Sequence, residues 1–229
     1  MENNKTRIFF FVPVIVQIFV SFISYILFKV FAQMEVKGVE NIASLKKNVI
    51  FASNHSSECD PIIVRISLPL FSMHFTPLYY VSMMKHEYAG FGWKKFFYGG
   101  IFFRLLGAYP RYPGHKDYAY SLQNHLTILK KKRNILIFPE GKRTRDGSPG
   151  PVHGGVAFLS NRTNTPVVPV AIKGLVNFKL LDLLLFRKKI VVTIGKPIDP
   201  LTIIPQTNPT VEDYKKGAQY IMDAILRMV

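Results

Sequence analysis

Residues 49–61, VIFASNHSSECDP, contain the part of the chain that decides its fold. The stretch opens with four apolar residues in a row, which is typical of a strand buried on both faces of a parallel sheet. A polar turn follows, and Pro61 stands where proline is favoured, in the first turn of a helix. The sequence therefore predicts a strand, a short turn and a helix, the unit from which open α/β sheets are built.

The turn places His55 and Asp60 directly after the buried strand. Open α/β sheets collect their active sites at such strand ends. A carboxylate five residues after a histidine can fold back and accept the second N–H of the imidazole, which makes the histidine a competent general base. The pair alone is also compatible with a simpler interpretation, in which Asp60 is a helix N-cap and His55 a surface residue.

Short apolar runs alternate with longer helical patterns along the rest of the chain, which is typical of an α/β domain. We expect a mixed, largely parallel central sheet flanked by helices. Strands are predicted at residues 34–37, 49–52, 78–83, 135–138, 167–172 and 190–194. Helices are predicted at residues 61–71, 92–106, 116–132, 154–161 and 210–228.

The composition limits the classes of protein to which the chain can belong. Its 229 residues are 48% hydrophobic and 19% charged, which excludes wholesale disorder. The single cysteine, Cys59, excludes an intrachain disulfide and a zinc site built from cysteines. With 30 Lys and Arg against 14 Asp and Glu, the net charge of +16 favours anionic partners. Many of the 19 Phe residues lie in apolar clusters and no nucleic-acid-binding motif is recognisable, so anionic membrane lipids are favoured over nucleic acid.

Residues 8–28 form a run of 21 residues without a charge. As a helix with a rise of about 1.5 Å per residue, the run would span about 31 Å, close to the thickness of a bilayer's hydrocarbon core. Gln17, Ser21 and Ser24 recur at helical spacing, and this weak polar stripe suits a helix that lies in the membrane interface or packs on its neighbour. We therefore predict a membrane-anchoring helix within residues 1–33 and a catalytic domain over residues 34–229.

Basic residues flank the apolar run unevenly. Lys5 and Arg7 precede it, whereas Lys29, Lys37, Lys46 and Lys47 follow it, so we place the main domain on the cytoplasmic face of the cell membrane. A cleaved signal peptide is the alternative, because residues 30–32, VFA, resemble a cleavage site, although the apolar run is longer than a typical signal. A second, weaker membrane contact is expected at residues 178–188, FKLLDLLLFRK, for which a core helix is the alternative.

A second buried strand ends in a turn crowded with cations. Residues 135–145 read ILIFPEGKRTR, so Lys142, Arg143 and Arg145 would repel one another unless an anion binds between them. Arginine can grip phosphate oxygens in a bidentate fork, and Gly141 allows a close approach to the backbone. The turn is therefore interpreted as a phosphate cradle, with a solvated basic turn as the alternative. A third stretch, residues 166–172, PVVPVAI, is a strand whose two prolines suit a sheet edge or the side of a cleft.

Together, these three stretches resemble the glycerolipid acyltransferase family that includes the 1-acyl-glycerol-3-phosphate acyltransferases. Residues 54–60 are similar to its NHxxxxD block, residues 138–144 to its FPEGTRS block and residues 167–170 to its fourth block, and the resemblance covers roughly residues 35–200. It implies that His55 is the catalytic base, that Asp60 orients it, and that the turn after residue 138 binds the phosphate of the acceptor. The substrate-binding residues expected on this basis are Asn54, Arg111, Glu140, Gly141, Lys142, Arg143, Thr144 and Pro169.

The sequence departs from the family's second block, in which an arginine follows a glycine by six residues. Counting from Gly107, that position is Pro113, so either Arg111 replaces the arginine or the phosphate is gripped by a different set of residues. Lys142 and Thr144 also replace the usual Thr and Ser. Because a carboxylate would repel phosphate, Glu140 is expected to hold an arginine or the backbone of its own loop.

The resemblance implies an enzyme, an O-acyltransferase that acts on a lysophospholipid. The expected reaction moves a fatty acyl chain from acyl-CoA or acyl carrier protein to the free hydroxyl of lysophosphatidate, giving phosphatidate for phospholipid synthesis without a cofactor or a metal. Alternatives are the same transfer to glycerol 3-phosphate or another lysophospholipid, a covalent route through Cys59, and a non-catalytic lipid-binding protein. A lipid-binding protein would not need the pair of His55 and Asp60.

Overall fold

A computed structural model of the chain describes residues 8–90, 92, 98–112, 117–144, 146–179, 181–182 and 189–229. Within these residues, seven strands form one sheet in the order β1-β7-β6-β2-β5-β3-β4. The five strands from β6 to β4 run parallel, β7 is antiparallel to β6, and β1 is parallel to β7. The predicted mixed, largely parallel sheet is therefore confirmed. The strands are β1 (Glu35–Lys37), β2 (Ile50–Ser53), β3 (Leu78–Ser82), β4 (Ala108–Pro110), β5 (Asn134–Ile137), β6 (Val167–Lys173) and β7 (Val191–Ile194).

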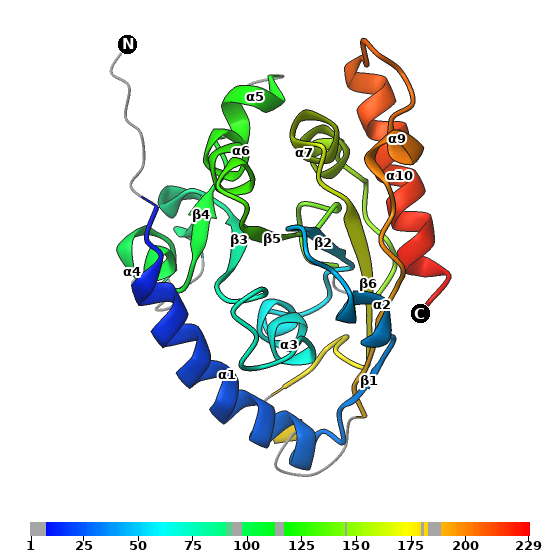
Figure 1. The fold of residues 1–229 in the computed structure, drawn as a ribbon. Coiled ribbons are helices and arrows are strands. Elements are labelled where there is room, and N and C mark those ends of the chain that lie inside the picture. The colour runs from blue at the N-terminus through cyan, green and yellow to red at the C-terminus, as the bar shows by residue number, and fades with distance from the viewer. Residues whose placement is uncertain are drawn as a thin grey trace.

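Helices cover both faces of the sheet (Figure 1), with α1 and α3 on one side and α6, α7 and α10 on the other. Successive residues of a strand point to opposite faces, so Ile50 packs under α6, α7 and α10 while Phe51 packs under α3. Both faces of β2 are thus buried, as its run of apolar residues predicts. The helices are α1 (Phe11–Phe31), α2 (Glu40–Ala43), α3 (Asp60–Ser67), η1 (Lys85–Tyr88), α4 (Gly100–Leu105), α5 (Tyr118–Ser121), α6 (Gln123–Lys130), α7 (Gly155–Thr163), α9 (Pro200–Ile203) and α10 (Val211–Leu226).

Several predicted elements differ from the observed ones in their limits. The helix predicted at residues 61–71 ends at Ser67, two residues before Pro69, which cannot continue it. The helix predicted at residues 116–132 is divided into α5 and α6 at Leu122. Strand β4 was not predicted, although the equally short β1 was, because the residues of β4, Ala108–Pro110, show no apolar run and end in a proline.

The two prolines of β6 were expected to suit a sheet edge or the side of a cleft, and the edge is wrong. The strand lies inside the sheet between β2 and β7. The missing N–H of Pro169 is tolerated there because the pairing with β7 begins only at Val170, and because Gly195 donates its backbone N–H to the Pro169 carbonyl over 2.8 Å.

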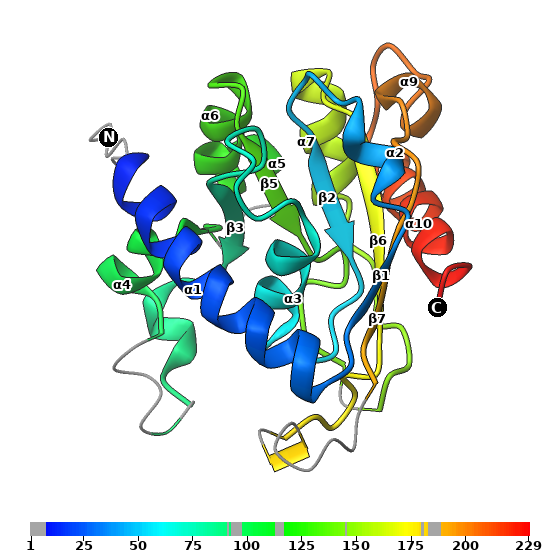
Figure 2. The ribbon, with the colours of Figure 1, turned by 60° about the horizontal axis from the view of Figure 1, so that its bottom comes forward.

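Helix α1 lies along the domain and is fixed to it by a buried glutamine. The side chain of Gln17 is 4% exposed. Its Nε2 donates to the carbonyl oxygens of Leu78 over 2.6 Å and of Leu106 over 2.9 Å. Its Oε1 accepts the N–H of Leu78 over 2.9 Å. Gly107 is required beside it, since a Cβ there would lie 2.8 Å from Nε2. Gln17 and Ser21 of the predicted polar stripe are thus buried against the domain, along which α1 lies (Figure 2).

The opposite side of α1 is apolar and exposed, with Phe11 78% and Ile15 69% accessible, followed by Phe19, Phe22 and Ile26. Among the described residues, α1 is the one helix long and apolar enough to cross a membrane by length and composition. The second contact predicted at residues 178–188 lies largely outside the described residues. Phe178 itself packs near Phe28 of α1, with ring centroids 6.1 Å apart.

Burial of His125 in α6 makes stability depend on pH. The side chain is fully buried, its Nε2 lies 3.4 Å from the Tyr80 carbonyl oxygen, and desolvation lowers its pKa from 6.5 to about 4. The unfolded chain therefore binds the extra proton between these two values, so the free energy of unfolding falls as pH falls through that window. We expect a loss of about 3 kcal/mol between pH 7 and pH 4 from this group.

Urea unfolding at a series of pH values checks this prediction, with His125→Gln as the variant that cannot titrate. The variant should show a flatter stability profile between pH 6.5 and 4 than the wild-type chain, whatever its stability at pH 7. A profile parallel to that of the wild-type chain would show that other groups cause the acid sensitivity.

Candidate active site

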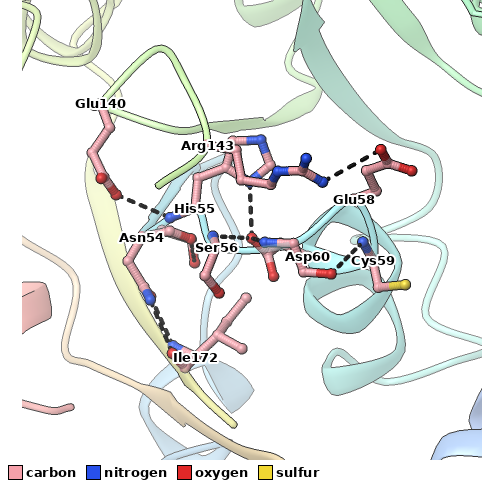
Figure 3. Close-up of polar contacts among 11 residues, drawn as sticks. Asn54, His55, Ser56, Glu58, Cys59, Asp60, Glu140, Arg143 and Ile172 are labelled. Atoms are coloured by element: carbon pink, nitrogen blue, oxygen red, sulfur yellow. Dashed lines mark hydrogen bonds and ion pairs between the residues drawn. The ribbon is translucent and has the colours of Figure 1, made fainter. Parts of the chain in front are cut away.

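The turn between β2 and α3 brings His55 and Asp60 together at the carboxyl edge of the sheet, beside the loop that follows β5 (Figure 3). Nδ1 of His55 lies 2.8 Å from Oδ2 of Asp60. The same oxygen accepts the backbone N–H groups of Ser56 over 2.6 Å and Ser57 over 2.8 Å, and Asp60 is fully buried in the first turn of α3. The carboxylate is thus held by the turn itself and does not cap the helix.

The imidazole of His55 is held from a second direction by Phe138, which follows β5. The two rings stack with their centroids 4.1 Å apart and their planes 15° apart. The His55 side chain keeps 21% of its surface exposed. Since Nδ1 faces Asp60, Nε2 is the ring nitrogen available to take a proton from an incoming hydroxyl.

Glu140 supports the backbone of His55 and does not extend into the turn as a free carboxylate. It is 2% exposed; its Oε1 accepts the N–H of His55 and its Oε2 accepts the N–H of Gly150, each over 3.0 Å. The N–H of Thr144 donates to the carbonyl of His55 over 2.8 Å. The N–H and the carbonyl of His55 are therefore both fixed by the loop that follows β5. Glu140 was expected to hold either an arginine or backbone, and the structure shows that it holds backbone N–H groups.

Asn54 also bonds to backbone. Its Nδ2 donates to the carbonyl of Ile172 over 2.9 Å, and its Oδ1 accepts the N–H of Ile172 over 2.8 Å. Asn54 thus ties the end of β2 to β6. Pro169 is buried within β6 opposite Ala52, so the structure places it in the sheet and not on the surface of the turn.

The two arginines predicted to bind substrate are paired with carboxylates: Arg143 lies beside the turn between β2 and α3, whereas Arg111 follows the edge strand β4, beyond β5 and β3. Nη1 of Arg143 lies 3.3 Å from Oε1 of Glu58, and the hydroxyl of Tyr98 donates to the other Glu58 oxygen over 3.0 Å. Burial raises the pKa of Tyr98 to about 12, with a further contribution from Glu58, so the phenol stays protonated and can donate. Nη2 of Arg111 lies 3.0 Å from Oε1 of Glu87.

The remaining predicted residues lie on the same loop. Lys142 is exposed, and Gly141 adopts φ of 66°, where a Cβ would lie 2.9 Å from the ring of His153. Arg145 lies outside the described residues. Sequence reasoning missed Glu58 as the partner of Arg143, although an acid three residues after His55 in a turn facing a basic loop is a usable signal.

Cys59 is half-buried, its N–H donates to Oγ of Ser57 over 3.2 Å, and its sulfur points away from His55 in Figure 3. The thiol therefore does not form the nucleophile and base pair that a covalent route through Cys59 would need. In the part of the chain that is described, no cluster of three or more His, Cys, Asp or Glu side chains could hold a metal ion.

Comparison with known proteins adds independent information. The family profile described as Acyltransferase matches residues 33–173. The chain is 27% identical over 147 residues to the chloroplastic 1-acyl-sn-glycerol-3-phosphate acyltransferase BAT2 of Brassica napus, an alignment that covers 63% of this chain and 38% of the relative. It is also 27% identical over 150 residues to a 1-acyl-sn-glycerol-3-phosphate acyltransferase of Limnanthes douglasii, covering 62% and 45%. The chain thus spans less than half the length of these relatives.

The fold is similar to the crystal structure of the 1-acyl-sn-glycerophosphate acyltransferase PlsC from Thermotoga maritima. The TM-score is 0.63 at 19% identity, over 94% of this chain and 77% of that one. The similarity therefore covers the sheet, the flanking helices and nearly all of the chain. Because the family profile spans well over half of the sequence and includes both turns of the site, the chain belongs to the acyltransferase family.

Proposed function

We propose that the chain transfers a fatty acyl group from a thioester donor to the free hydroxyl of lysophosphatidate, giving phosphatidate for phospholipid synthesis. The observation that carries the proposal is the contact of 2.8 Å between His55 and the buried carboxylate of Asp60, beside the basic loop that contains Arg143. The relatives named above act on 1-acyl-glycerol-3-phosphate, which supports the same acceptor here.

In this mechanism, Nε2 of His55 accepts the proton of the acceptor hydroxyl as its oxygen attacks the thioester carbonyl. Asp60 accepts the N–H of Nδ1, so it keeps the imidazole in the required tautomer and stabilises the imidazolium that forms. The tetrahedral intermediate then expels the thiolate, which takes the proton from His55, and the new ester leaves as product. Neither Glu140 nor Asn54 touches the substrate in this scheme, because both hold the backbone around His55.

The test offers the purified protein a panel of acceptors with acyl-CoA and with acyl carrier protein as donors. We expect transfer to lysophosphatidate to exceed transfer to glycerol 3-phosphate and to lysophosphatidylcholine. If only glycerol 3-phosphate is acylated, lysophosphatidate is refuted as the acceptor, whereas acyl transfer to a hydroxyl remains the reaction. If no acceptor is acylated with either donor, the chain is a lipid-binding protein and not an enzyme.

We propose that Arg143 binds the phosphate of the acceptor. In the absence of substrate it pairs with Glu58, so an incoming phosphate competes with that carboxylate for the guanidinium. Arg143→Ala should raise the KM for lysophosphatidate about tenfold to a hundredfold and leave the KM for the donor nearly unchanged, because a charge-assisted contact contributes about 1.5 to 3 kcal/mol. Steady-state kinetics with each substrate varied in turn measure the two constants.

The matched control is Arg162→Ala, which removes the same charge from an exposed position on α7. Glu58→Gln should lower the KM for lysophosphatidate, since it removes the competing carboxylate. If Arg143→Ala raises only the KM for the donor, the loop binds the donor and the assignment is wrong. Arg111→Ala should behave like Arg143→Ala if Arg111 takes the place of the arginine missing from the second block.

We propose further that residues 1–33 anchor the domain of residues 34–229 on the cytoplasmic face of the cell membrane, with α1 lying in the membrane interface. The helix is bound to the domain through Gln17, and its exposed face is apolar from Phe11 onward. A helix held along its length by the domain is better suited to lie on a bilayer than to cross it. Cleavage after residue 32 would remove Gln17 from the fold, which argues against a signal peptide.

A further inference from the structure

A second basic site lies at the amino edge of the sheet, where α1 begins. A cavity of about 450 Å³ is lined by Ile8, Phe10, Tyr79, Ile128, Lys131 and Arg133. Ile8, Phe10 and Ile128 make part of its wall apolar, whereas Lys131 and Arg133 make another part basic, so the cavity suits a ligand with an anionic and an apolar part. None of the described residues that line it is acidic.

The two cations are placed by the end of α6. Lys132 adopts φ of 58°, which ends the helix and turns the chain into β5, so that Lys131 and Arg133 on either side of it both reach the cavity. The guanidinium carbon of Arg133 lies 3.9 Å from the centroid of the Phe10 ring. This cation–π contact orients Arg133 without neutralising its charge.

The wall formed by residues 8–10 is fixed by two tyrosines. The hydroxyl of Tyr109 accepts the N–H of Phe9 over 2.6 Å, and the hydroxyl of Tyr79 donates to the Phe9 carbonyl over 2.8 Å. Burial raises the pKa of Tyr79 to about 12, which keeps that donor protonated. The cavity thus has a defined position, directly before Phe11, where the exposed apolar face of α1 begins.

We infer that this cavity binds the phosphate headgroup of an anionic membrane lipid. The inference rests on the proposed attachment of α1 to the membrane, which places the cavity at the level of the headgroups. Lys131 and Arg133 would pair with the phosphate, and Ile8, Phe10 and Ile128 would contact the glycerol and the first methylenes. A zwitterionic lipid gains less here, because its own cation is repelled by the two basic side chains.

A donor protein is a poorer occupant of this cavity. Tyr79 and Arg133 lie at the amino ends of β3 and β5, whereas His55 follows the carboxyl end of β2. The four residues of β2 alone separate these edges by about 13 Å at about 3.3 Å per residue. A thioester presented from a carrier bound at the amino edge would have to pass around the sheet to reach His55.

The experiment measures sedimentation of the full chain with vesicles of phosphatidylcholine, with or without about 30 mol% phosphatidylglycerol, at about 150 mM salt. The double variant Lys131→Ala/Arg133→Ala should bind the anionic vesicles about tenfold to thirtyfold more weakly, since each basic residue near such a surface contributes about 1 kcal/mol. Binding to pure phosphatidylcholine, which α1 provides, should not change. Lys196→Ala/Lys216→Ala is the control, because it removes the same two charges from exposed positions away from the cavity and should cost less than about threefold.

If both double variants lose the same amount of binding to anionic vesicles, diffuse charge attraction explains the binding and the inference is overturned. Arg133→Lys keeps the charge and should retain most of the binding to anionic vesicles. This result would show that the loss in the alanine variant comes from the missing charge and not from a folding defect. Titration with water-soluble dihexanoyl phosphatidylglycerol should raise the Tm of the wild-type chain but not of the double variant. An equal rise with inorganic phosphate would overturn the lipid as ligand and assign the cavity to free phosphate.

The last measurement is the rate of acyl transfer by the double variant. With lysophosphatidate dispersed in detergent, Lys131→Ala/Arg133→Ala should keep the wild-type kcat, since the cavity lies away from His55. A loss of transfer from acyl carrier protein alone, with vesicle binding intact, would make the surface a donor site and overturn the inference. A wild-type chain that binds vesicles as expected and transfers no acyl group would refute the proposed function and leave the lipid site standing.

Discussion

His55→Ala is expected to lower kcat for acyl transfer by about 10² to 10⁴ while the protein stays folded. The imidazole is held by Asp60 on one side and by Phe138 on the other, so its removal takes away the group positioned to accept the hydroxyl proton. The backbone bonds of residue 55 to Glu140 and Thr144 do not involve the side chain and should survive. Release of the donor thiol measures the rate, and a thermal melt checks the fold.

Two variants serve as controls for this result. His86→Ala removes an exposed histidine from η1 and should keep the wild-type rate. Cys59→Ser changes the same turn as His55 and should also remain active, because the sulfur points away from the imidazole. A near-normal rate in His55→Ala would refute the mechanism, and an inactive Cys59→Ser with a trapped acyl thioester would establish the covalent route.

Asp60→Asn should lower kcat by about tenfold to a thousandfold, less than the loss of the base itself, with little change in the KM for either substrate. The amide oxygen can still accept the N–H groups of Ser56 and Ser57, but a neutral partner no longer stabilises the imidazolium that forms at His55. Single-substrate titrations separate the effect on kcat from the effect on KM.

Asp60→Ala provides the structural comparison. It leaves the buried N–H of Ser57 and the half-buried N–H of Ser56 without their acceptor, at a cost of about 1 to 3 kcal/mol for the buried group, so it should lower the Tm more than Asp60→Asn does. If Asp60→Asn instead raises the KM for lysophosphatidate and leaves kcat unchanged, the carboxylate helps to bind the acceptor, and its assignment as the group that orients His55 fails.

The contact between His55 and Asp60 was predictable because it is local. The two residues lie in one turn between a strand and a helix, and that turn is fixed by the apolar run before it and by Pro61 after it. The contacts of Glu140 were not predictable in detail. They join His55 to a loop 85 residues later, and they exist only because β2 and β5 are neighbours in the sheet.

For the fold, too, local features were predictable from the sequence, whereas features that depend on distant residues were not. Long apolar runs identified the parallel strands, whereas the place of each strand depends on the whole sheet. The two prolines of residues 166–172 suggested an edge or the side of a cleft, yet β6 lies inside the sheet, where its pairing with β7 begins only beyond Pro169. The three residues of β4 carry too little pattern to be recognised alone.

The Gln17 contacts have a consequence for how the proposed enzyme would meet its substrate. Because α1 is bonded to the sheet at Leu78, the height of His55 above the lipid surface would be set by the folded protein once α1 lies in the membrane interface as proposed. A lysolipid keeps its free hydroxyl at a nearly constant depth in the bilayer. Lateral diffusion alone would therefore deliver this hydroxyl to an imidazole that is held at the same depth. A helix that lies in one leaflet is also indifferent to the thickness of the bilayer, and the same geometry would therefore serve in membranes of different lipid composition.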